Sequence, residues 1–267
     1  MIRVGIGGWT YEPWRGAFYP AGLRQADELA HASRELTSIE INGTFYRTQT
    51  PASFRKWAQE TPDDFVFAIK GPRYATNRAR LGEALPAIER FATSGLAELG
   101  SKLGPISWQF APTKKFEPED FEAFLTLLPP SVDGLRLRHA VEVRHDSFKD
   151  PAFVALARRY SVAIVYADHD TYPAIADVTA DFVYARLMGC VEDQPTGYAP
   201  EALAAWARRF EVWAEGGEPA DLPRLTSSGA SANGRDCFVY FISGAKVRAP
   251  AAAKAFMAQL RAPPARP

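Results

Sequence analysis

Short runs of β-branched and aromatic residues alternate along the chain with longer stretches of helical periodicity. The strand-like runs lie at residues 3–7, 38–42, 65–70, 106–110, 140–144, 162–168, 182–188 and 237–242. The helical stretches lie near residues 24–34, 51–60, 84–100, 118–128, 151–160, 199–215 and 249–261. The segment 171–179, which follows the sixth strand-like run, is short and only weakly helical.

This alternation predicts the fold class. Strands that alternate with helices favour parallel pairing through right-handed crossovers. A TIM barrel has eight such units, so we expect an α/β fold with a single TIM (β/α)8 barrel domain over residues 1–267. An open doubly wound sheet is the structural alternative. Residues 216–234 are rich in Gly, Pro, Ala and Ser, and we expect a flexible surface loop there, opposite the active face.

The pattern within each strand indicates which side chains point into the barrel, because side chains alternate between the two faces of a strand. In "SIEIN", Ile39 and Ile41 suit the side that faces the helices, which places Glu40 and Asn42 inside. A buried carboxylate is costly unless it is paired or hydrogen-bonded. We therefore expect Glu40 to share a network with a cation from another strand.

The same test predicts further polar side chains inside the barrel, toward the carboxyl ends of their strands. They are Lys70, Gln109, Glu142, Arg144, Tyr166, Asp168, Tyr184, Arg186 and Tyr240. In the sixth strand, Val165 is expected to face the helices instead. Barrel enzymes build their sites at the carboxyl ends of the strands, so the set predicts a charged functional pocket. The alternative is a charge-balanced network that only plugs the barrel mouth.

The predicted loops at this end add aromatic and basic side chains. Trp9, Tyr11 and Trp14 could stack on a sugar or a base, or form a packed lid, and Tyr46 follows the second strand. Arg73, in the loop after the third strand, suits contacts with an anion.

Two further loops carry weaker signals. His145 lies just past the fifth strand, next to the expected pocket. The segment "SGAKVRAP", residues 243–250, resembles the turn before the last helix that binds phosphate in many barrels.

Composition narrows the classes of function. The formal net charge is +0, with 31 basic and 31 acidic residues, so a dedicated nucleic-acid or anionic-membrane binder is not indicated. The two cysteines, Cys190 and Cys237, form no CxxC pair, and four histidines are few for a metal site, so we expect free thiols, no metal and no cofactor. With no signal peptide and no apolar run long enough to span a bilayer, we expect a cytoplasmic protein without membrane contact.

Several motifs together resemble the YecE-like family, domain of unknown function 72. They are "GGWTYEPWRGAFYP", "IEINGTFYR", "FAIKGPRY", "LGPISWQFAP", "VEVRHDSF", "YADHDTYP", "DFVYARLMG" and "AKVRAP". The resemblance covers nearly the whole chain and implies a TIM barrel of the bacterial or archaeal cytoplasm, without implying a particular reaction. The positions it highlights are Glu40, Asn42, Lys70, Gln109, Glu142, Arg144, His145, Asp168 and Arg186.

The chain departs from the family pattern at two places. Family members commonly have His where this chain has Met188, and Asn residues where it has Ile242 and Ser243. Roles that rest on those family residues are therefore not carried over to this chain.

The leading hypothesis is an enzyme that acts by acid–base chemistry on a small polar, anionic or carbohydrate-like substrate, which could carry a phosphate. The catalytic candidates are Glu40, Glu142, Lys70 and Asp168. The substrate-binding candidates are Trp9, Tyr11, Trp14, Asn42, Tyr46, Arg73, Gln109, Arg144, His145, Arg186 and Tyr240. These residue types fit a hydrolase, an isomerase or a lyase.

Three alternatives stay open. The first is a metal-dependent isomerase or phosphodiesterase of the xylose-isomerase-like kind, with ligands from Glu40, Glu142, Asp168, His145 and His169. The second is a barrel that binds a nucleotide or the end of a nucleic acid without catalysis. The third is Schiff-base chemistry at the lysine of the third strand, which an acidic neighbourhood would disfavour by holding the amine protonated.

Overall fold

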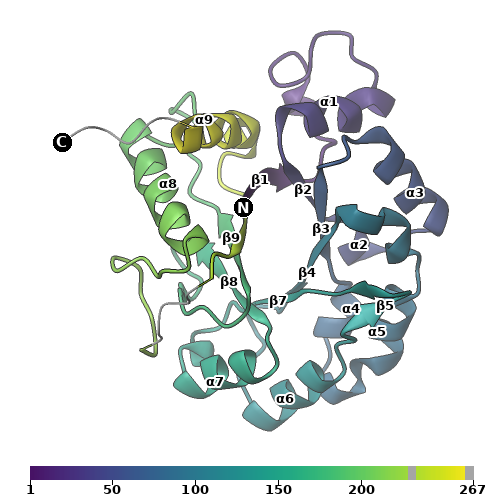
Figure 1. The fold of residues 1–267 in the computed structure, drawn as a ribbon, viewed down its shortest axis with the longest axis vertical. Helices are drawn as coiled ribbons and strands as arrows, with labels where there is room; N and C mark the ends of the chain where they lie inside the picture. Colours follow the sequence, from purple (N-terminus) through teal and green to yellow (C-terminus); the bar gives the residue numbers. More distant parts are fainter. Residues whose placement is uncertain (228–232, 262–267) are drawn as a thin grey trace.

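The computed structural model describes residues 1–227 and 233–261, in which a closed ring of strands is surrounded by helices (Figure 1). The strands of the ring are β1 (Ile2–Gly7), β2 (Ser38–Ile41), β3 (Val66–Lys70), β4 (Leu103–Gln109), β7 (His139–Glu142), β8 (Ala163–Asp168), β9 (Phe182–Leu187) and β10 (Asp236–Phe241). All neighbours pair in parallel, and β1 closes the ring against β10. The predicted eight-stranded barrel is confirmed, and the open-sheet alternative is wrong.

The helices connect successive strands on the outside of the ring. They are α1 (Glu28–Glu35), α2 (Gly43–Tyr46), α3 (Pro51–Glu60), α4 (Arg73–Thr76), α5 (Leu85–Ala92), α6 (Pro118–Thr126), α7 (Pro151–Arg159), α8 (Pro200–Ala214) and α9 (Ala249–Arg261). Local sequence explains several starts, because Pro51 and Pro151 open α3 and α7 where their missing N–H costs nothing. Thr50 and Asp150 precede them, and their side chains accept from backbone N–H groups of the first turn.

The stretch predicted as one helix over residues 84–100 is broken. A 3-10 helix over Leu96–Lys102 follows α5, and the break lies at Gly95, which has a φ of 107°. A Cβ atom there would lie 2.5 Å from the Cα atom of Pro51, so only glycine fits this approach of two elements. A short hairpin of β5 (Ser131–Val132) and β6 (Leu135–Arg136), which was not predicted, turns at Asp133 and Gly134.

The weak helix expected over residues 171–179 is wrong, because residues 173–179 form neither a helix nor a strand. Two side chains hold this segment in an open conformation instead. Thr179 Oγ1 accepts from the backbone N–H of Ile164 at 3.1 Å, and the Asp177 carboxylate accepts from the backbone N–H groups of Leu225 and Thr226. Side chains that bond to backbone compete with a helix for the same groups.

The segment that bonds to Asp177 belongs to the predicted surface loop, residues 216–234. Its described residues, 216–227 and 233–234, contain neither a helix nor a strand, and Leu222 is buried. Residues 228–232 lie outside the described residues. The contacts with Asp177 hold the loop against residues 173–179, the segment that replaces the expected helix on this side of the barrel. The mobility of the loop stays a prediction.

The interior of the ring is divided into an apolar lower part and a polar mouth. The apolar part is filled by Val66, Ala68, Ala140, Ala163, Val165, Phe182, Tyr184, Phe238 and Tyr240. The alternation predicted for most strands is confirmed, but β8 is an exception. Val165 lies inside, and Tyr166 lies outside against Trp206 and Trp213 of α8. The sixth run is apolar at consecutive positions, so its pattern held no information about which parity faces inward.

Ring closure leaves no room for a side chain at Gly5. Gly5 is paired with Ser38, and a Cβ atom there would lie 2.2 Å from the Ser38 carbonyl oxygen. We expect Gly5→Ala to lower the free energy of unfolding by at least about 2 kcal/mol, as overpacking against backbone does. Gly43→Ala is the control, because the nearest atom to its added Cβ lies 3.6 Å away. Urea denaturation of both variants measures the difference, and equal midpoints would contradict it.

Candidate functional site

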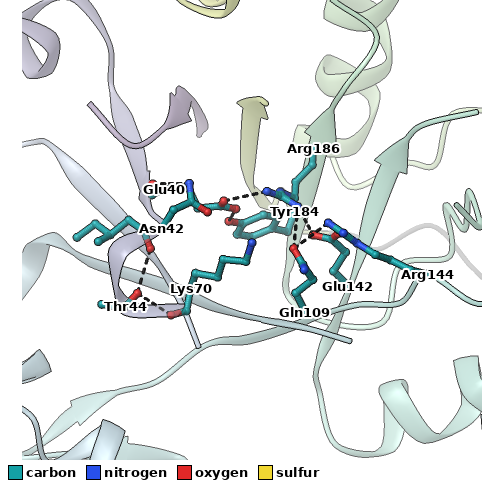
Figure 2. Close-up of polar contacts among 10 residues, drawn as sticks. Glu40, Asn42, Thr44, Lys70, Gln109, Glu142, Arg144, Tyr184 and Arg186 are labelled. Carbon is teal, nitrogen blue, oxygen red and sulfur yellow. Dashed lines mark hydrogen bonds and ion pairs between the residues drawn. The ribbon is translucent and has the colours of Figure 1, made fainter. Parts of the chain in front are cut away.

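Arg186 links two buried carboxylates at the barrel mouth (Figure 2). Its Nη2 atom lies 3.2 Å from Glu40 Oε1, and its Nη1 atom donates to Glu142 Oε2. The Tyr184 hydroxyl donates to the second oxygen of Glu40 at 2.6 Å. Glu40 and Glu142 are both fully buried. The partner expected for Glu40 is therefore an arginine from another strand, β9.

Arg144 holds the other side of Glu142. Its Nε atom donates to Glu142 Oε1 at 2.6 Å, and its Nη2 atom donates to Gln109 Oε1 at 2.8 Å. Its guanidinium also lies over the ring of Tyr172, 4.5 Å from the centroid. Burial alone would raise the pKa of Glu142, but the charges of Arg186, Arg144 and Lys70 outweigh it and hold that pKa below its usual value. Glu142 therefore stays ionised at neutral pH.

Lys70 is buried at the end of β3 and lies near this network without joining its hydrogen bonds. Its ammonium lies 4.5 Å from the ring centroid of Phe45, and within the described residues no acceptor bonds to its Nζ atom. Burial lowers the pKa of Lys70 to about 8, and the charge of Arg186 acts in the same direction. Glu40 and Glu142 oppose this shift. Lys70 is thus a lysine at the barrel mouth that titrates closer to neutral pH than an ordinary lysine does.

A cavity of about 730 Å³ opens above the network, at the carboxyl ends of the strands. Its aromatic wall consists of Trp9, Trp14, Phe45, Tyr46, Trp57 and Phe241. Its basic side chains are Arg47, Lys70, Arg144, Arg186 and Lys246. Among the described residues, no acidic side chain lines it, because the carboxylates of the network lie beneath the cations. A ligand in this cavity therefore contacts the basic side chains and not the carboxylates beneath them.

The structure brings together eight of the residues predicted for the site. Those that line the cavity are Trp9, Trp14, Asn42, Tyr46, Lys70, Gln109, Arg144 and Arg186. Two fully buried carboxylates, Glu40 and Glu142, support them from below. Tyr240 lies deeper, where its hydroxyl is 2.7 Å from Ser38 Oγ.

Besides Glu40, Glu142 and Tyr240, four predicted site residues do not line the cavity. Tyr11 packs edge-on against Trp14, and Arg73 lies over the ring of Tyr46, 5.8 Å from its centroid. His145 Nδ1 accepts from the backbone N–H of Ser147 at 3.1 Å and so caps a short 3-10 helix. The fourth is Asp168.

The prediction that Asp168 points into the barrel is wrong, because β8 turns Val165 inward and the residues of the other parity outward. It shares the parity of Tyr166, and the hydroxyl of Tyr198 donates to its Oδ2 atom at 3.3 Å. The Tyr198 hydroxyl also accepts from the backbone N–H of Gly189 at 2.7 Å. Burial raises the pKa of Asp168. This carboxylate therefore organises the loop after β9, away from the network.

The ligand set predicted for a metal centre is dispersed. Asp168 faces Tyr198, His145 bonds to Ser147, and His169 stacks on Tyr172 with a centroid distance of 4.0 Å. In the part of the chain that the structure describes, no three His, Cys, Asp or Glu side chains are grouped so that they could hold a metal ion.

The turn at residues 243–250 contributes side chains to the cavity, and three of its backbone N–H groups are engaged within the fold. The backbone N–H groups of Ala245, Lys246 and Arg248 donate to carbonyl oxygens within the fold. Ser243 and Lys246 line the cavity, together with Ile242. Of the two places where the chain departs from the family pattern, Ile242 with Ser243 lies at the cavity, and Met188 does not line it.

Sequence reasoning missed several lining residues. Phe45 and Arg47 follow β2 directly, and Trp57 reaches the cavity from α3. The signal for the first two was available, because residues just past the carboxyl end of a barrel strand belong to the active face. Trp57 carried no such signal, since it lies within a helix whose apolar face packs on the barrel.

A closed parallel β/α barrel with a polar, charged cavity at the carboxyl ends of its strands defines a protein of the TIM-barrel class. The sequence profile of the family described as "Protein of unknown function DUF72" matches residues 3–267. The chain belongs to this family.

Two curated relatives are similar to about half of this chain. The chain is 28% identical over 151 residues to the UPF0759 protein YecE of Escherichia coli K12, which is 55% of this chain and 50% of YecE. It is 28% identical over 160 residues to the UPF0759 protein YunF of Bacillus subtilis 168, which is 57% of this chain and 54% of YunF. The chain therefore spans about half the length of these curated relatives.

A solved structure confirms the fold. The DUF72 family protein TM1631 of Thermotoga maritima MSB8 superposes with a TM-score of 0.75 at 21% identity, over 98% of this chain and 100% of that one. Within the described residues, none of the helices has the length and apolar character needed to cross a bilayer.

Proposed function

We propose that the protein is an enzyme that binds a small organic anion at the barrel mouth and acts on it by acid–base chemistry through Lys70. The observation that carries the proposal is a buried amine that lines a cation-rich cavity without an acceptor among the described residues. Perturbed groups of this kind cluster at functional sites.

The charges of the mouth favour an anionic substrate. Glu40 and Glu142 contribute two negative charges, and Arg144, Arg186 and protonated Lys70 contribute three positive ones, so the network carries one net positive charge. The carboxylates are buried beneath the cations. Preorganised cations in a partly desolvated site also stabilise negative charge that develops during a reaction.

The carboxylates themselves do not fit the role of acid or base that the sequence suggested. Both oxygens of Glu142 are engaged by arginines, and both oxygens of Glu40 are engaged by Arg186 and Tyr184. Neither side chain lines the cavity. We assign them to holding the arginines in place, which leaves Lys70 as the group that transfers protons.

The aromatic wall supports a substrate with a flat or ring-shaped part. Trp9 lies edge-on to Trp57, with centroids 5.3 Å apart, and both line the cavity beside Phe45. Aromatic faces bind sugar rings, bases and other planar groups by contact and exclude water from the reacting atoms.

The experiment is a thermal-shift and calorimetric comparison of small carboxylates and phosphates with their neutral amides or alcohols. Anions are expected to bind and their neutral analogues are not. Arg144→Met should weaken binding by about tenfold or more, since a charge-assisted hydrogen bond contributes about 1.5–3 kcal/mol. Arg55→Met is the matched control, because Arg55 pairs with Glu98 outside the cavity.

The pH dependence provides a second test of the same proposal. Lys70 is protonated below its pKa of about 8, so anion affinity should be greatest below that pH and fall as pH rises through it. Guanidinium groups stay charged throughout this range, so the change in affinity reports on Lys70. Equal binding of anions and neutral analogues, or the same loss in both arginine variants, would refute the proposal.

A further inference from the structure

Two buried lysines, Lys70 and Lys102, differ in whether their ammonium groups have hydrogen-bond acceptors. Lys102 is 8% exposed, and its Nζ atom donates to Ala58 O at 2.6 Å, Thr61 O at 2.7 Å and Thr61 Oγ1. Lys70 is 7% exposed and has no such acceptor among the described residues. A buried ammonium without acceptors destabilises the fold. Lys102 therefore serves the structure, whereas no such structural role accounts for the position of Lys70.

We propose that Lys70 is a nucleophile that forms an imine with an anion bearing an aldehyde or ketone group. The inference rests on the proposed function and names the substrate class of the same site. Its basis is the position of the amine, on the lining of the same cavity as the guanidinium groups of Arg144 and Arg186. Schiff-base formation requires such a desolvated amine, held next to other cations.

The surroundings of Lys70 suit both the anion and the carbonyl group. The Arg186 Nε–H is buried and has no acceptor among the described residues, and Arg144 also lines the cavity. These groups are suited to the carboxylate or phosphate of the substrate. Phe45 covers the amine on one side, which limits access of the water that would hydrolyse an imine.

The step balances without a co-reactant. The neutral Lys70 amine adds to the carbonyl carbon: a C–N bond forms, the π bond of the carbonyl group breaks, and one amine proton passes to the carbonyl oxygen. Loss of that hydroxyl with the remaining amine proton releases one water and leaves the C=N bond. The substrate and the lysine are neither oxidised nor reduced. The bound imine then draws electrons from the neighbouring carbon, which promotes proton removal or C–C cleavage there.

The acidic neighbourhood does not hold this amine fully protonated, as the sequence suggested it would. Glu40 and Glu142 raise the pKa of Lys70, but burial and the charge of Arg186 outweigh them, with a smaller contribution from Arg144. A pKa of about 8 leaves about a tenth of the amines neutral at pH 7. An unperturbed lysine, with a pKa of about 10.4, has fewer than about one in a thousand neutral.

The test is reductive trapping of the full chain with glyoxylate or pyruvate and cyanoborohydride at pH 7, followed by intact-mass analysis and peptide mapping. We expect one reduced adduct per chain at Lys70, formed at least about ten times faster than at exposed lysines such as Lys56 and Lys149. Acetate or lactate, which have no aldehyde or ketone group, should slow trapping by competition. The same protein in urea should lose the selectivity.

Lys70→Arg distinguishes chemistry from binding, because it keeps the positive charge and cannot form an imine. It should bind acetate and lactate and give no adduct. Selective trapping at Lys70 supports the inference. If anions bind the wild-type protein but Lys70 is trapped no faster than Lys56 or Lys149, the inference is wrong and the proposed function stands. If neither anions nor carbonyl compounds bind, both are wrong.

Discussion

Replacing Arg186 with Met is expected to lower the free energy of unfolding by about 3–5 kcal/mol, which is the usual effect of removing one member of a buried ion pair. The variant keeps most of the side-chain volume, so packing changes little. Glu40 loses its cationic partner, and Glu142 retains only Arg144. Urea denaturation at pH 7 measures the loss, and the cavity of the variant should no longer bind anions.

The pH dependence identifies the cause. In the variant, a buried carboxylate without its arginine has a folded-state pKa raised above its unfolded value, so its penalty is present at high pH and lost as pH falls through the raised value. The difference from wild type should therefore shrink toward pH 5. Arg144→Met is the control, since it leaves both carboxylates paired with Arg186 and should cost less. A loss below about 1 kcal/mol for Arg186→Met would show that the network does not stabilise the mouth.

Replacing Lys70 with Met should abolish imine trapping while leaving the protein as stable as wild type, or more stable by about 1–3 kcal/mol at pH 7. The charged amine is desolvated, and the lowered pKa of about 8 means that folding disfavours its protonated form. Met fills the same space without a charge. A group that destabilises the fold and is required for chemistry is typical of an active site.

The sign of the pH effect follows from linkage. Between about pH 8 and pH 10.5 the unfolded chain keeps the Lys70 proton that the folded protein has lost, so wild-type stability rises with pH in this window. The gain in the free energy of unfolding of Lys70→Met over wild type is therefore largest below pH 8 and shrinks above it. Lys102→Met is the matched control and should be destabilising, because it leaves the acceptors at Ala58 and Thr61 unpaired. A destabilised Lys70→Met with unchanged trapping would contradict this assignment.

Alternation along the strands predicted much of the site because single charges were flanked by apolar residues. Glu40 lies between two isoleucines and Glu142 between two valines, so parity alone placed both inside. The same reasoning failed for Asp168, which ends a run of consecutive apolar and aromatic residues. In such a run, the pairing of the strand with its neighbours sets which side chains point into the barrel, and the sequence pattern does not. In β8 this pairing turns Val165 inward.

Other features depended on contacts between distant segments. The extended segment before β9 is held by bonds from Asp177 to Leu225 and Thr226, about fifty positions along the chain. Local propensity does not contain that information. The lowered pKa of Lys70 was missed because residue types indicated nearby carboxylates but not that burial and the charge of Arg186 would outweigh them.

Closure of the ring sets the order in which the protein can assemble. β1 pairs with β10, and the indole N–H of Trp14 donates to the carbonyl oxygen of Lys246 at 3.0 Å, across 232 positions of sequence. Contacts of such separation form late, after the loop-closure entropy between the chain ends has been overcome. During synthesis, Trp14 and Lys246, which both line the cavity, therefore meet only once nearly the whole chain has been released. A nascent chain without β10 has Lys70 but no finished cavity around it.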